Sequence, residues 1–400
     1  MSDTSSPASG RSASRMTVYS FIGAVTISAC SSAPTPLYHL YQELFRLSPA
    51  MITLIFGSYA FSLLAALLTL GGLSDYIGRR PLILLALLLN AAALVIFLLA
   101  ESGAMLMAAR IVQGFATGIA FPTFGAAILD TDKTRGPILN SITAFLGLMI
   151  GTLTAGTLVA FAPEPTRLIY ELLLGITAAG ILALALMPET TSGRPGAIAA
   201  MRPQLSVPRR ARPTLIRVTP VNIAGWSLGG FYLSLMPTLV AVATGITSPF
   251  VGGAVVATLM LSATASVFIF RSWRAQTVLF TGASVLMIGV AITLFGVYLQ
   301  QVGVLFLGTA VAGLGFGSIF ANILRIMLPL AEGHERAGLF SAFLVESYLA
   351  FAIPAIAAGL AAPKLGLSVT AYVYGIVIII LAAASILATR SRTSECAAVC

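Results

Sequence analysis

Twelve apolar runs constrain the fold of this 400-residue chain more than any other feature. Each is close to the roughly 20 residues that a helix needs to cross the hydrocarbon core of a bilayer. Backbone groups in lipid must pair within the chain, so each run predicts a membrane-spanning helix. The predicted spans are 17–37, 50–70, 81–100, 104–128, 138–161, 168–187, 217–243, 250–270, 275–298, 302–327, 338–361 and 366–388.

Composition supports a membrane protein. Hydrophobic residues make up 58% of the chain and charged residues 9%, whereas a soluble domain carries about 25% charge. The chain therefore lacks the charge to cover itself with a water-compatible surface. We predict an all-α membrane fold, with the lipid bilayer as the solvent for most of the chain.

The positions of the basic residues predict orientation. If residue 1 lies inside the cell, 18 of the 22 lysines and arginines fall in cytoplasmic segments and three fall in external loops. Such a bias is what the positive-inside rule predicts. We expect a multi-pass protein of the cell inner membrane with both termini in the cytoplasm. The net charge of +9 does not indicate nucleic-acid binding, because the basic residues lie between spans and do not line one helix face.

A proline- and arginine-rich stretch divides the spans six and six. Weak internal symmetry accompanies it, because Gly114 and Gly118 in span four match Gly313 and Gly317 in span ten at an offset of 199. We predict two pseudo-symmetric six-helix bundles. The expected domains are a polar tail at 1–16, bundles at 17–187 and 217–389, a basic cytoplasmic linker at 188–216, and a tail at 390–400.

The connection between spans two and three reads G-G-L-S-D-Y-I-G-R-R from Gly71 to Arg80, and span four contains A-R-I-V-Q-G-F-A-T-G. The loop pattern G-x-L-x-D-x-x-G-R-R resembles the cytoplasmic signature of the major facilitator superfamily, and R-x-x-Q-G resembles a motif of its proton-coupled members. The resemblance implies a twelve-helix major facilitator fold. Span five departs from the drug/proton antiporter pattern, with Thr152 in place of a proline.

The loop residues predict a gating latch. Asp75 is expected to lie against the first turn of span eleven, near 337–339, where free N–H groups favour a carboxylate. The resemblance also pairs Arg79 with Asp130, and such a latch would bias the outward-open state. Gly78 would allow a tight turn, and Gly71 the close approach of a second helix. The alternative is that Asp75, Arg79 and Arg80 only fix topology. The predicted latch comprises Gly71, Asp75, Gly78, Arg79, Arg80 and Asp130.

Three polar residues inside spans are candidates for proton or substrate coupling: Arg110, Gln113 and Glu346. Arg110 would keep a nearby acid ionised or hold a substrate carboxylate; alternatively, it bonds helix carbonyls. Glu346 is the only acid well inside a span and would carry a proton if it lacked a partner. The alternative is a neutral carboxyl hydrogen-bonded between helices.

A mostly apolar cavity is expected between the bundles, suited to an amphipathic or aromatic substrate. Asn222 and Trp226 share one helix face. Each candidate polar residue serves equally well as helix-packing contact. The predicted cavity residues are Thr26, Ser31, Thr117, Asn222, Trp226, Tyr232, Asn322 and Tyr348.

The sequence carries no enzyme, metal or cofactor motif. We therefore predict a monomeric secondary transporter, not an enzyme, whose partners are a small-molecule substrate, protons and lipid, with no cofactor and no nucleic acid. The expected function is proton-coupled export of a small apolar or amphipathic compound by alternating access. The alternative is transport of a small organic anion or metabolite, in either direction.

Overall fold

A computed structural model describes residues 7–203, 205–332 and 335–399. Residues 1–6 of the predicted N-terminal tail and residue 400 of the predicted C-terminal tail lie outside these ranges. The described regular elements are all helices: α1 Pro7–Ser32, η1 Thr35–Leu37, α2 Tyr38–Phe45, α3 Pro49–Leu70, α4 Ser74–Ile77, α5 Arg79–Leu98, α6 Gly103–Thr131, α7 Gly136–Phe161, α8 Leu168–Leu184, α9 Ala197–Ala200, α10 Arg212–Ser234, α11 Met236–Thr244, α12 Pro249–Phe270, α13 Ala275–Leu299, α14 Val302–Met327, η2 Leu328–Leu330, α15 Arg336–Leu365 and α16 Leu367–Val399.

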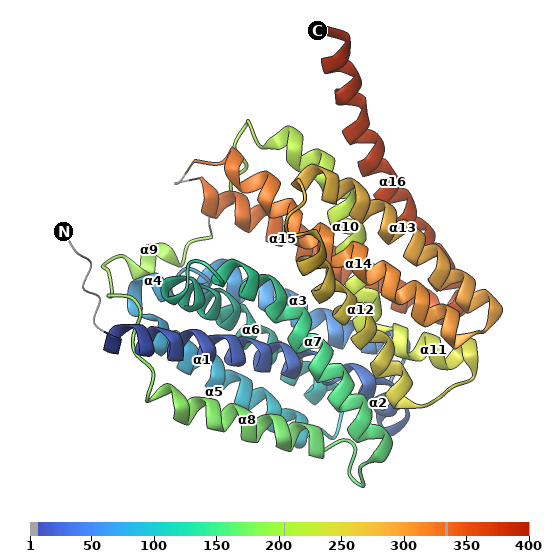
Figure 1. Ribbon diagram of the computed structural model, residues 1–400. Helices are drawn as coiled ribbons and strands as arrows, with labels where there is room; N and C mark the ends of the chain where they lie inside the picture. Colours follow the sequence, from blue (N-terminus) through green and yellow to red (C-terminus); the bar gives the residue numbers. More distant parts are fainter. Residues whose placement is uncertain (1–6, 204, 333–334, 400) are drawn as a thin grey trace.

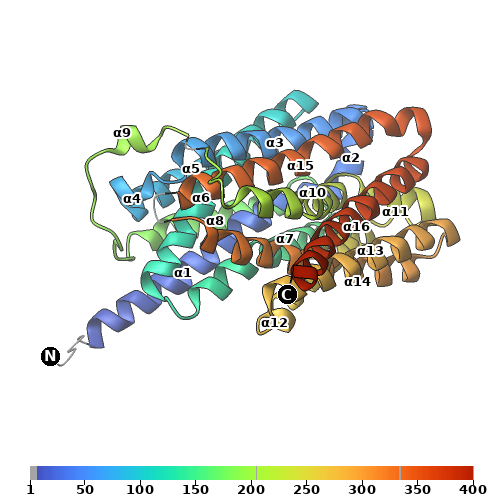
Figure 2. The same ribbon diagram turned by 90° about the horizontal axis from the view of Figure 1, so that it is seen from above.

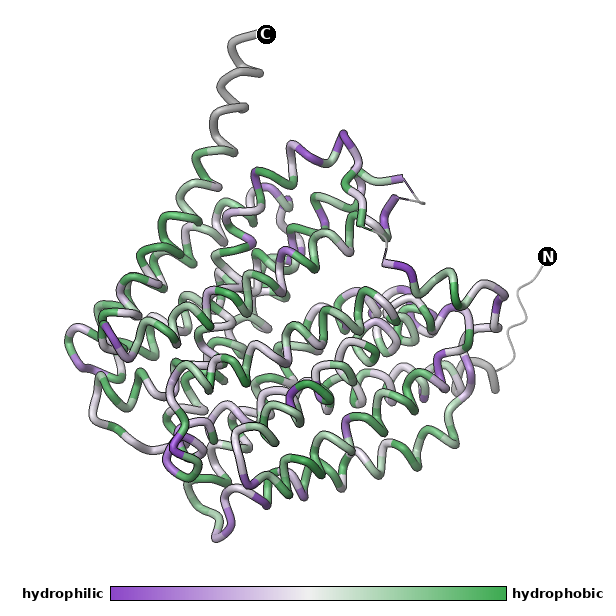
Figure 3. Tube along the Cα trace, turned by 180° about the vertical axis from the view of Figure 1, so that it is seen from behind, coloured by the Kyte–Doolittle hydropathy of each residue, from purple (hydrophilic) through white to green (hydrophobic). Residues whose placement is uncertain are grey.

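The lengths and hydropathy of these helices confirm the all-α membrane fold. Within the described residues, ten helical segments are long and apolar enough to cross a bilayer. The bent pair α10 and α11 forms one more span, and α8 is a shorter apolar helix of 17 residues. Figure 3 shows apolar residues along the helices and hydrophilic residues concentrated in the connections. These segments match the twelve predicted spans in order.

Two of the spans that the sequence predicts as continuous helices are interrupted in the structure. Span one ends at Ser32 and continues through η1 into α2, and span seven bends by 67° between α10 and α11. Prolines explain both breaks, because proline has no N–H for the helical hydrogen bond and its ring clashes with the preceding turn. Pro34 and Pro36 lie at the first break, and Pro237 lies just after the second.

The helices form two bundles, one built from α1 to α8 and one from α10 to α16 (Figure 1). The glycine pairs of spans four and ten allow the same close helix packing in their respective bundles. A β-carbon on Gly114 or Gly118 would overlap the α3 backbone at Tyr59 or Leu63, and one on Gly313 or Gly317 would overlap the α12 backbone. This equivalence confirms the predicted internal symmetry of the two bundles.

The bundles meet most closely at one end. We call the end that carries α4 and α9 the linker side, and the end that carries α2 and α11 the far side. Figure 2 shows α3 beside α15, and at the far side a β-carbon on Gly359 of α15 would overlap Thr53 of α3. In the same way, one on Gly253 of α12 would lie 2.6 Å from the Thr152 carbonyl of α7. Toward the linker side, the two groups of helices diverge (Figures 1 and 3).

The connection between the bundles is anchored to both of them. Its Arg194 N–H donates to the Tyr76 carbonyl of the first bundle at 2.8 Å, and its Ser206 N–H donates to the Gly338 carbonyl of α15 at 3.4 Å. Arg210 pairs with Glu332 and Glu335 at 2.9 and 2.6 Å. Hydrogen bonds from the guanidinium to these two carboxylates raise the pKa of Arg210. The linker therefore runs across the linker side and is bonded to both bundles.

Candidate functional site

Three of the six predicted latch residues, Asp75, Arg79 and Asp130, form one ion cluster on the linker side of the first bundle. Arg79 begins α5 and its side chain is only 7% exposed. Its Nε donates to Asp130 Oδ2 of α6 at 3.0 Å, and its Nη1 donates to Ser74 Oγ at 2.6 Å and pairs with Asp75. A nearly buried guanidinium thus holds two carboxylates from different helices, an arrangement that fixes the α4 turn against α6.

Glu189, which the sequence analysis placed in the linker without a role, completes this cluster. Its Oε1 accepts the Arg79 N–H at 2.8 Å and its Oε2 accepts the Arg80 N–H at 3.0 Å. The carboxylate therefore caps the positive N-terminus of α5. Thr190 extends the contact by donating to Asp130 Oδ2 at 3.1 Å. The pairs lie 109 and 110 residues apart, so no local pattern could have revealed them.

The two loop glycines have different roles. Gly78 has φ +108° and ψ 154°, a conformation that side chains disfavour, and a β-carbon there would lie 2.8 Å from Glu189 Oε2. Glycine is therefore required for the cap to form. Gly71 has an ordinary helical φ of −59°, and the atoms nearest to its missing β-carbon belong to Leu67 one turn earlier. The expected close approach of a second helix at Gly71 stays a prediction.

The expected partner of Asp75 is covered by the linker in this structure. The first turn of α15 contains Gly338, where a β-carbon would overlap Ser206 Oγ. Asp75 lies on the other bundle, 56% exposed, and pairs with Arg79 four residues later. The structure therefore brings Asp75, Arg79 and Asp130 together, while the contact between Asp75 and α15 stays a prediction for a different arrangement of the bundles.

Arg110 and Gln113 of α6 cap the broken end of α1. Pro34 has no N–H to donate to the Cys30 carbonyl, and Gln113 Nε2 donates to that oxygen at 2.9 Å. Arg110 Nη1 donates to the next carbonyl, of Ser31, at 2.7 Å and to Gln113 Oε1 at 2.8 Å. A cation at the C-terminal end of a helix is favoured by the helix dipole. The R-x-x-Q spacing therefore closes the interruption in the first span.

The Arg110 side chain is buried and uncompensated by an acid. It is 2% exposed, and among the described residues no carboxylate lies within ion-pair distance of it. The guanidinium instead lies over the Tyr59 ring, 4.2 Å from its centroid, and 6.0 Å from that of Phe56. Its Nε has no hydrogen-bond partner within the described part of the chain. Helix carbonyls and ring faces carry the stabilisation that an ion pair would otherwise supply.

The matching break in the second bundle is capped from across the interface. Pro237 cannot donate to the Leu233 carbonyl, and Thr35 Oγ1 of the first bundle donates to it at 2.9 Å. Thr35 is buried and belongs to η1, the broken segment after α1. The two interrupted spans therefore contact each other at the far side, and the hydrogen bond from Thr35 to the Leu233 carbonyl connects the bundles.

Aromatic rings from both bundles form one cluster near the middle of the interface. Phe145 of α7 packs edge-on against Phe316 and Phe320 of α14, at 5.4 Å between centroids in both pairs. On the second bundle, Trp226 contacts Phe320, Tyr348 and Phe351 at 5.8, 5.0 and 5.9 Å. Phe56 of α3 contacts Phe351 at 4.9 Å. We call the seven residues Phe56, Phe145, Trp226, Phe316, Phe320, Tyr348 and Phe351 the aromatic cluster.

Glu346 borders this cluster and has two hydrogen-bond donors. Thr219 Oγ1 donates to Oε2 and Asn222 Nδ2 donates to Oε1, both at 2.9 Å. Asn222 also donates to Ser347 Oγ at 3.1 Å. The condition under which Glu346 was expected to take up a proton, a buried carboxyl without partners, is therefore not met here.

The remaining predicted cavity residues are scattered. Thr117 and Ser31 are buried and donate to carbonyls of their own helices, those of Gln113 and Ser28. Asn322 accepts from Arg325 Nη1 at 2.8 Å. Thr26 is half-buried on α1. The aromatic cluster contains only two of the eight predicted cavity residues, Trp226 and Tyr348.

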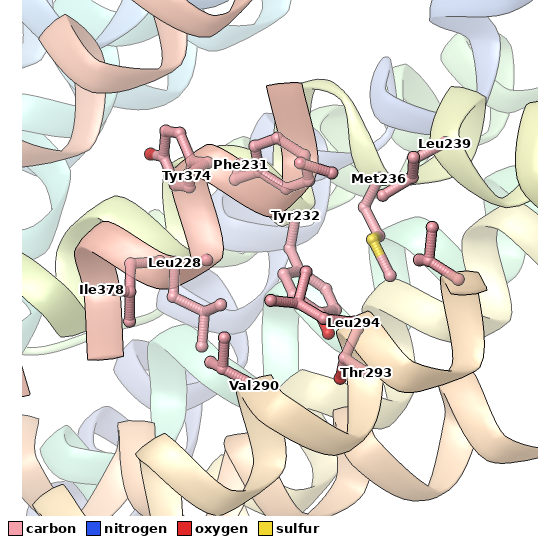
Figure 4. A pocket seen from close by; sticks show the side chains of 13 residues that line it. Leu228, Phe231, Tyr232, Met236, Leu239, Val290, Thr293, Leu294, Tyr374 and Ile378 are labelled. Atoms are coloured by element: carbon pink, nitrogen blue, oxygen red, sulfur yellow. The ribbon is translucent and has the colours of Figure 1, made fainter. Parts of the chain in front are cut away.

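Tyr232 lies apart from the aromatic cluster, inside the second bundle. Its hydroxyl bonds Thr309 Oγ1 at 2.8 Å, and its ring lines a pocket between α10, α11, α13 and α16. Figure 4 shows Tyr232 directed toward Thr293 among apolar side chains. The cavity measures about 30 Å³, whereas a drug-sized ligand needs about 300 Å³ or more. This pocket is therefore too small to be the substrate site.

Comparisons with known proteins agree with this geometry. The sequence profile of the Major Facilitator Superfamily matches residues 20–280. The chain is 28% identical over 155 residues to Multidrug resistance protein MdtL of Escherichia coli O81 (strain ED1a), a match that spans 38% of this chain and 39% of that protein. MdtL of Escherichia coli K12 (strain DH10B) matches at the same identity and coverage.

Two solved structures share the fold across nearly the whole chain. A mutant of the nucleoside transporter NupG has a TM-score of 0.72 at 13% identity and covers 94% of this chain and 99% of its own. The human organic anion transporter MFSD10 (TETRAN) has a TM-score of 0.68 at 15% identity, with 93% and 99% covered. The twelve spans, the Arg79 cluster and the profile match over more than half of the sequence lead to one assignment. The chain belongs to the Major Facilitator Superfamily and is a membrane transporter, not an enzyme.

Proposed function

We propose that this protein is a secondary active transporter that exports a small apolar or amphipathic compound in exchange for protons. The observation that carries the proposal is the aromatic cluster, to which α3 and α7 of one bundle and α10, α14 and α15 of the other contribute rings. A substrate held there contacts both bundles. Rocking of the bundles around it would expose the substrate to each side in turn, as in other transporters built from repeats.

The contact pattern supports an inward-facing arrangement. The bundles are in contact at the far side through Thr35 and Leu233 and through Thr53 and Gly359. They diverge at the linker side, which we propose faces the cytoplasm because its segments carry most of the arginines. In this arrangement an exporter would collect its substrate from the cytoplasm or from the cytoplasmic leaflet of the membrane. The partial match to the Multidrug resistance protein MdtL supports a drug-like substrate.

Glu346 is the proposed proton carrier. It is half-buried, and the side chains that hold it come from α10: Thr219 lies two helical turns before Trp226 and Asn222 one turn before it. We propose that substrate and proton bind alternately. A substrate at the aromatic cluster would hold Asn222 in its contact with Glu346, and departure of the substrate would free the carboxyl to take up a proton, so that substrate binding and proton release are linked.

The ion cluster around Arg79, which includes Asp75, is the proposed gate. When the linker side closes, the first turn of α15 would exchange Ser206 for Asp75, because a carboxylate is favoured at a helix N-terminus. The cluster around Arg79 holds Asp75 ready for this contact. The gate would therefore stabilise the outward-open state.

The test is proton release from purified protein in weakly buffered detergent. Lipophilic cations, neutral drugs and organic acids are added separately, and the pH change is recorded. An exchanger releases protons on binding its substrate, and Glu346→Gln abolishes this release while substrate binding persists. Substrate binding without proton release in the unmodified protein would contradict proton coupling. Substrate flux in proteoliposomes that behaves as diffusion through an open pore would contradict alternating access.

One observation favours a second candidate, transport of a small organic anion. Arg110 is buried without a carboxylate partner among the described residues, and its Nε is unpaired. An anion reaching it would neutralise the charge. The same screen decides, because this candidate predicts a response to organic acids and none to neutral drugs.

A further inference from the structure

Two polar atoms beside the aromatic cluster are buried and have no hydrogen-bond partner among the residues that the structure describes. One is the donor Nε1 of Trp226 and the other is the acceptor Oδ1 of Asn222. Both residues belong to α10, four positions apart, so they lie on one helix face. Asn222 is 1% exposed. The cluster therefore presents one unused donor and one unused acceptor next to seven rings.

Such atoms are exceptional in a folded protein, because a buried polar group without a partner loses its bonds to water and gains nothing in return. A bound molecule that supplies an acceptor to Trp226 and a donor to Asn222 would satisfy both atoms at once. The surrounding rings offer faces and edges for aromatic groups. Discrimination at such a site comes from hydrogen bonding, since ligands without these groups leave the protein atoms unpaired.

We propose that the aromatic cluster selects uncharged aromatic compounds whose rings are joined by a group that both accepts and donates a hydrogen bond, such as a secondary amide. Trp226 and Asn222 determine that selectivity. The inference rests on the proposed function, because it names the class of compound carried at that site. It also provides a link to coupling: the amide nitrogen of Asn222 donates to Glu346, so one side chain contacts both ligand and proton carrier.

The chain carries a built-in probe for this proposal. It has two tryptophans, Trp226 and Trp273, and Trp273 is 45% exposed in the connection after α12. In Trp273→Phe protein, all tryptophan emission comes from the aromatic cluster. Purified Trp273→Phe protein is titrated at fixed pH, without a membrane gradient, with three similarly shaped compounds: benzanilide, phenyl benzoate and trans-stilbene. Tetraphenylphosphonium is titrated in the same way as the charged compound of the comparison.

The expected order of affinity is benzanilide, phenyl benzoate, then trans-stilbene, with about tenfold between successive compounds, since each step removes one hydrogen bond and leaves a protein atom unpaired. Equal affinities for the three compounds overturn the proposal. So does tighter binding of tetraphenylphosphonium than of benzanilide, which would make the site a cation site.

A second variant tests the assigned residue. Trp226→Phe keeps an aromatic ring and removes the N–H, so in equilibrium dialysis with radiolabelled ligands the preference for benzanilide over trans-stilbene falls about tenfold. Trp273→Phe is the matched control and keeps the preference. An unchanged preference in Trp226→Phe overturns the assignment. If this variant does not fold, the ligand series on Trp273→Phe protein still decides.

These measurements separate the two proposals, because binding is read without transport. Selective binding of benzanilide without any proton release refutes proton-coupled export and leaves the selectivity of the aromatic cluster standing. Proton release by all four compounds with equal affinity refutes only the selectivity.

Discussion

The two bundles share an architecture but close the break in their first span with different chemistry. In the first bundle, Arg110 and Gln113 donate to the carbonyls at the end of α1. In the second, the position equivalent to Arg110 is Thr309, which bonds Tyr232, and Thr35 caps the Leu233 carbonyl. A hydroxyl group therefore suffices to satisfy the carbonyl that such a break leaves without its helical partner. The buried charge of Arg110 is more than the fold requires, which is the reason to regard it as functional.

The linker-side connections differ in the same sense. The first bundle holds Arg79 between Asp75 and Asp130 and caps α5 with Glu189. The corresponding connection of the second bundle runs from Arg271 to Arg274 and contains no acid. Repeated helices need no ion cluster at this point, so the cluster serves something that only one half does. A gate that acts from the first bundle on α15 fits that asymmetry.

The sharpest contrast is expected between Arg110→Gln and Thr309→Val. Arg110→Gln removes a charge-assisted bond worth about 1.5–3 kcal/mol, so transport is expected to fall by about tenfold or more. Thr309→Val removes a neutral hydroxyl bond worth about 1 kcal/mol and should leave transport within about twofold. Uptake assays in proteoliposomes, with protein amounts matched by gel filtration, give both values. Equal losses in the two variants would mean that Arg110 is a helix cap and nothing more.

A second contrast concerns the loops. Asp75→Asn keeps the shape of the side chain but removes the charge that the first turn of α15 would stabilise by about 0.3–2 kcal/mol. We expect transport to decrease by up to about thirtyfold with unchanged expression and membrane insertion. Arg274→Gln in the second-bundle loop is the control and is expected to transport normally. Full activity of Asp75→Asn would show that the loop charges only set topology.

The smallest effect is expected on stability, at Glu189. Glu189→Gln keeps one acceptor oxygen for the Arg79 and Arg80 N–H groups, replaces the other oxygen with a donating NH2 group and removes the negative charge at the start of α5, at a cost of about 0.5–1 kcal/mol. The matched control is Glu164→Gln, whose exposed ion pair with Arg167 at 3.8 Å contributes little. Thermal unfolding followed by circular dichroism compares the two. A Glu164→Gln variant that melts as low as Glu189→Gln would remove the cap from the account.

Much of the fold could be predicted from the sequence, because span length, the loop motif and the glycine pairs are local patterns with one physical meaning each. The breaks after Ser32 and Ser234 were missed, although Pro34, Pro36 and Pro237 signal them, because hydropathy continues through both breaks. The contacts of Glu189 with α5 and of Thr35 with Leu233 span more than 100 residues. Such pairs depend on how helices pack, which a single sequence does not encode locally.

The aromatic cluster illustrates the same limit. Trp226 and Tyr348 were expected near the substrate because they are polar at one end and lie in suitable spans. The five phenylalanines around them were not, since phenylalanine occurs throughout apolar spans. Tyr232 looked equally suitable, but its face of α10 points into the second bundle toward Thr309. Knowing which face of a helix meets the other bundle requires the structure.

Alternating access is tested most directly by two distances measured in one protein. Spin labels on cysteines at Thr134 and Ser272, both exposed on the linker side, report one opening, and labels at Glu101 and Gln301 on the far side report the other. Cys30, Cys396 and Cys400 are first replaced by serine. Pulsed electron spin resonance with and without substrate should show the linker-side distance shortening while the far-side distance lengthens. Two distances that stay fixed, or that change in the same direction, would contradict rocking of the two bundles about the aromatic cluster.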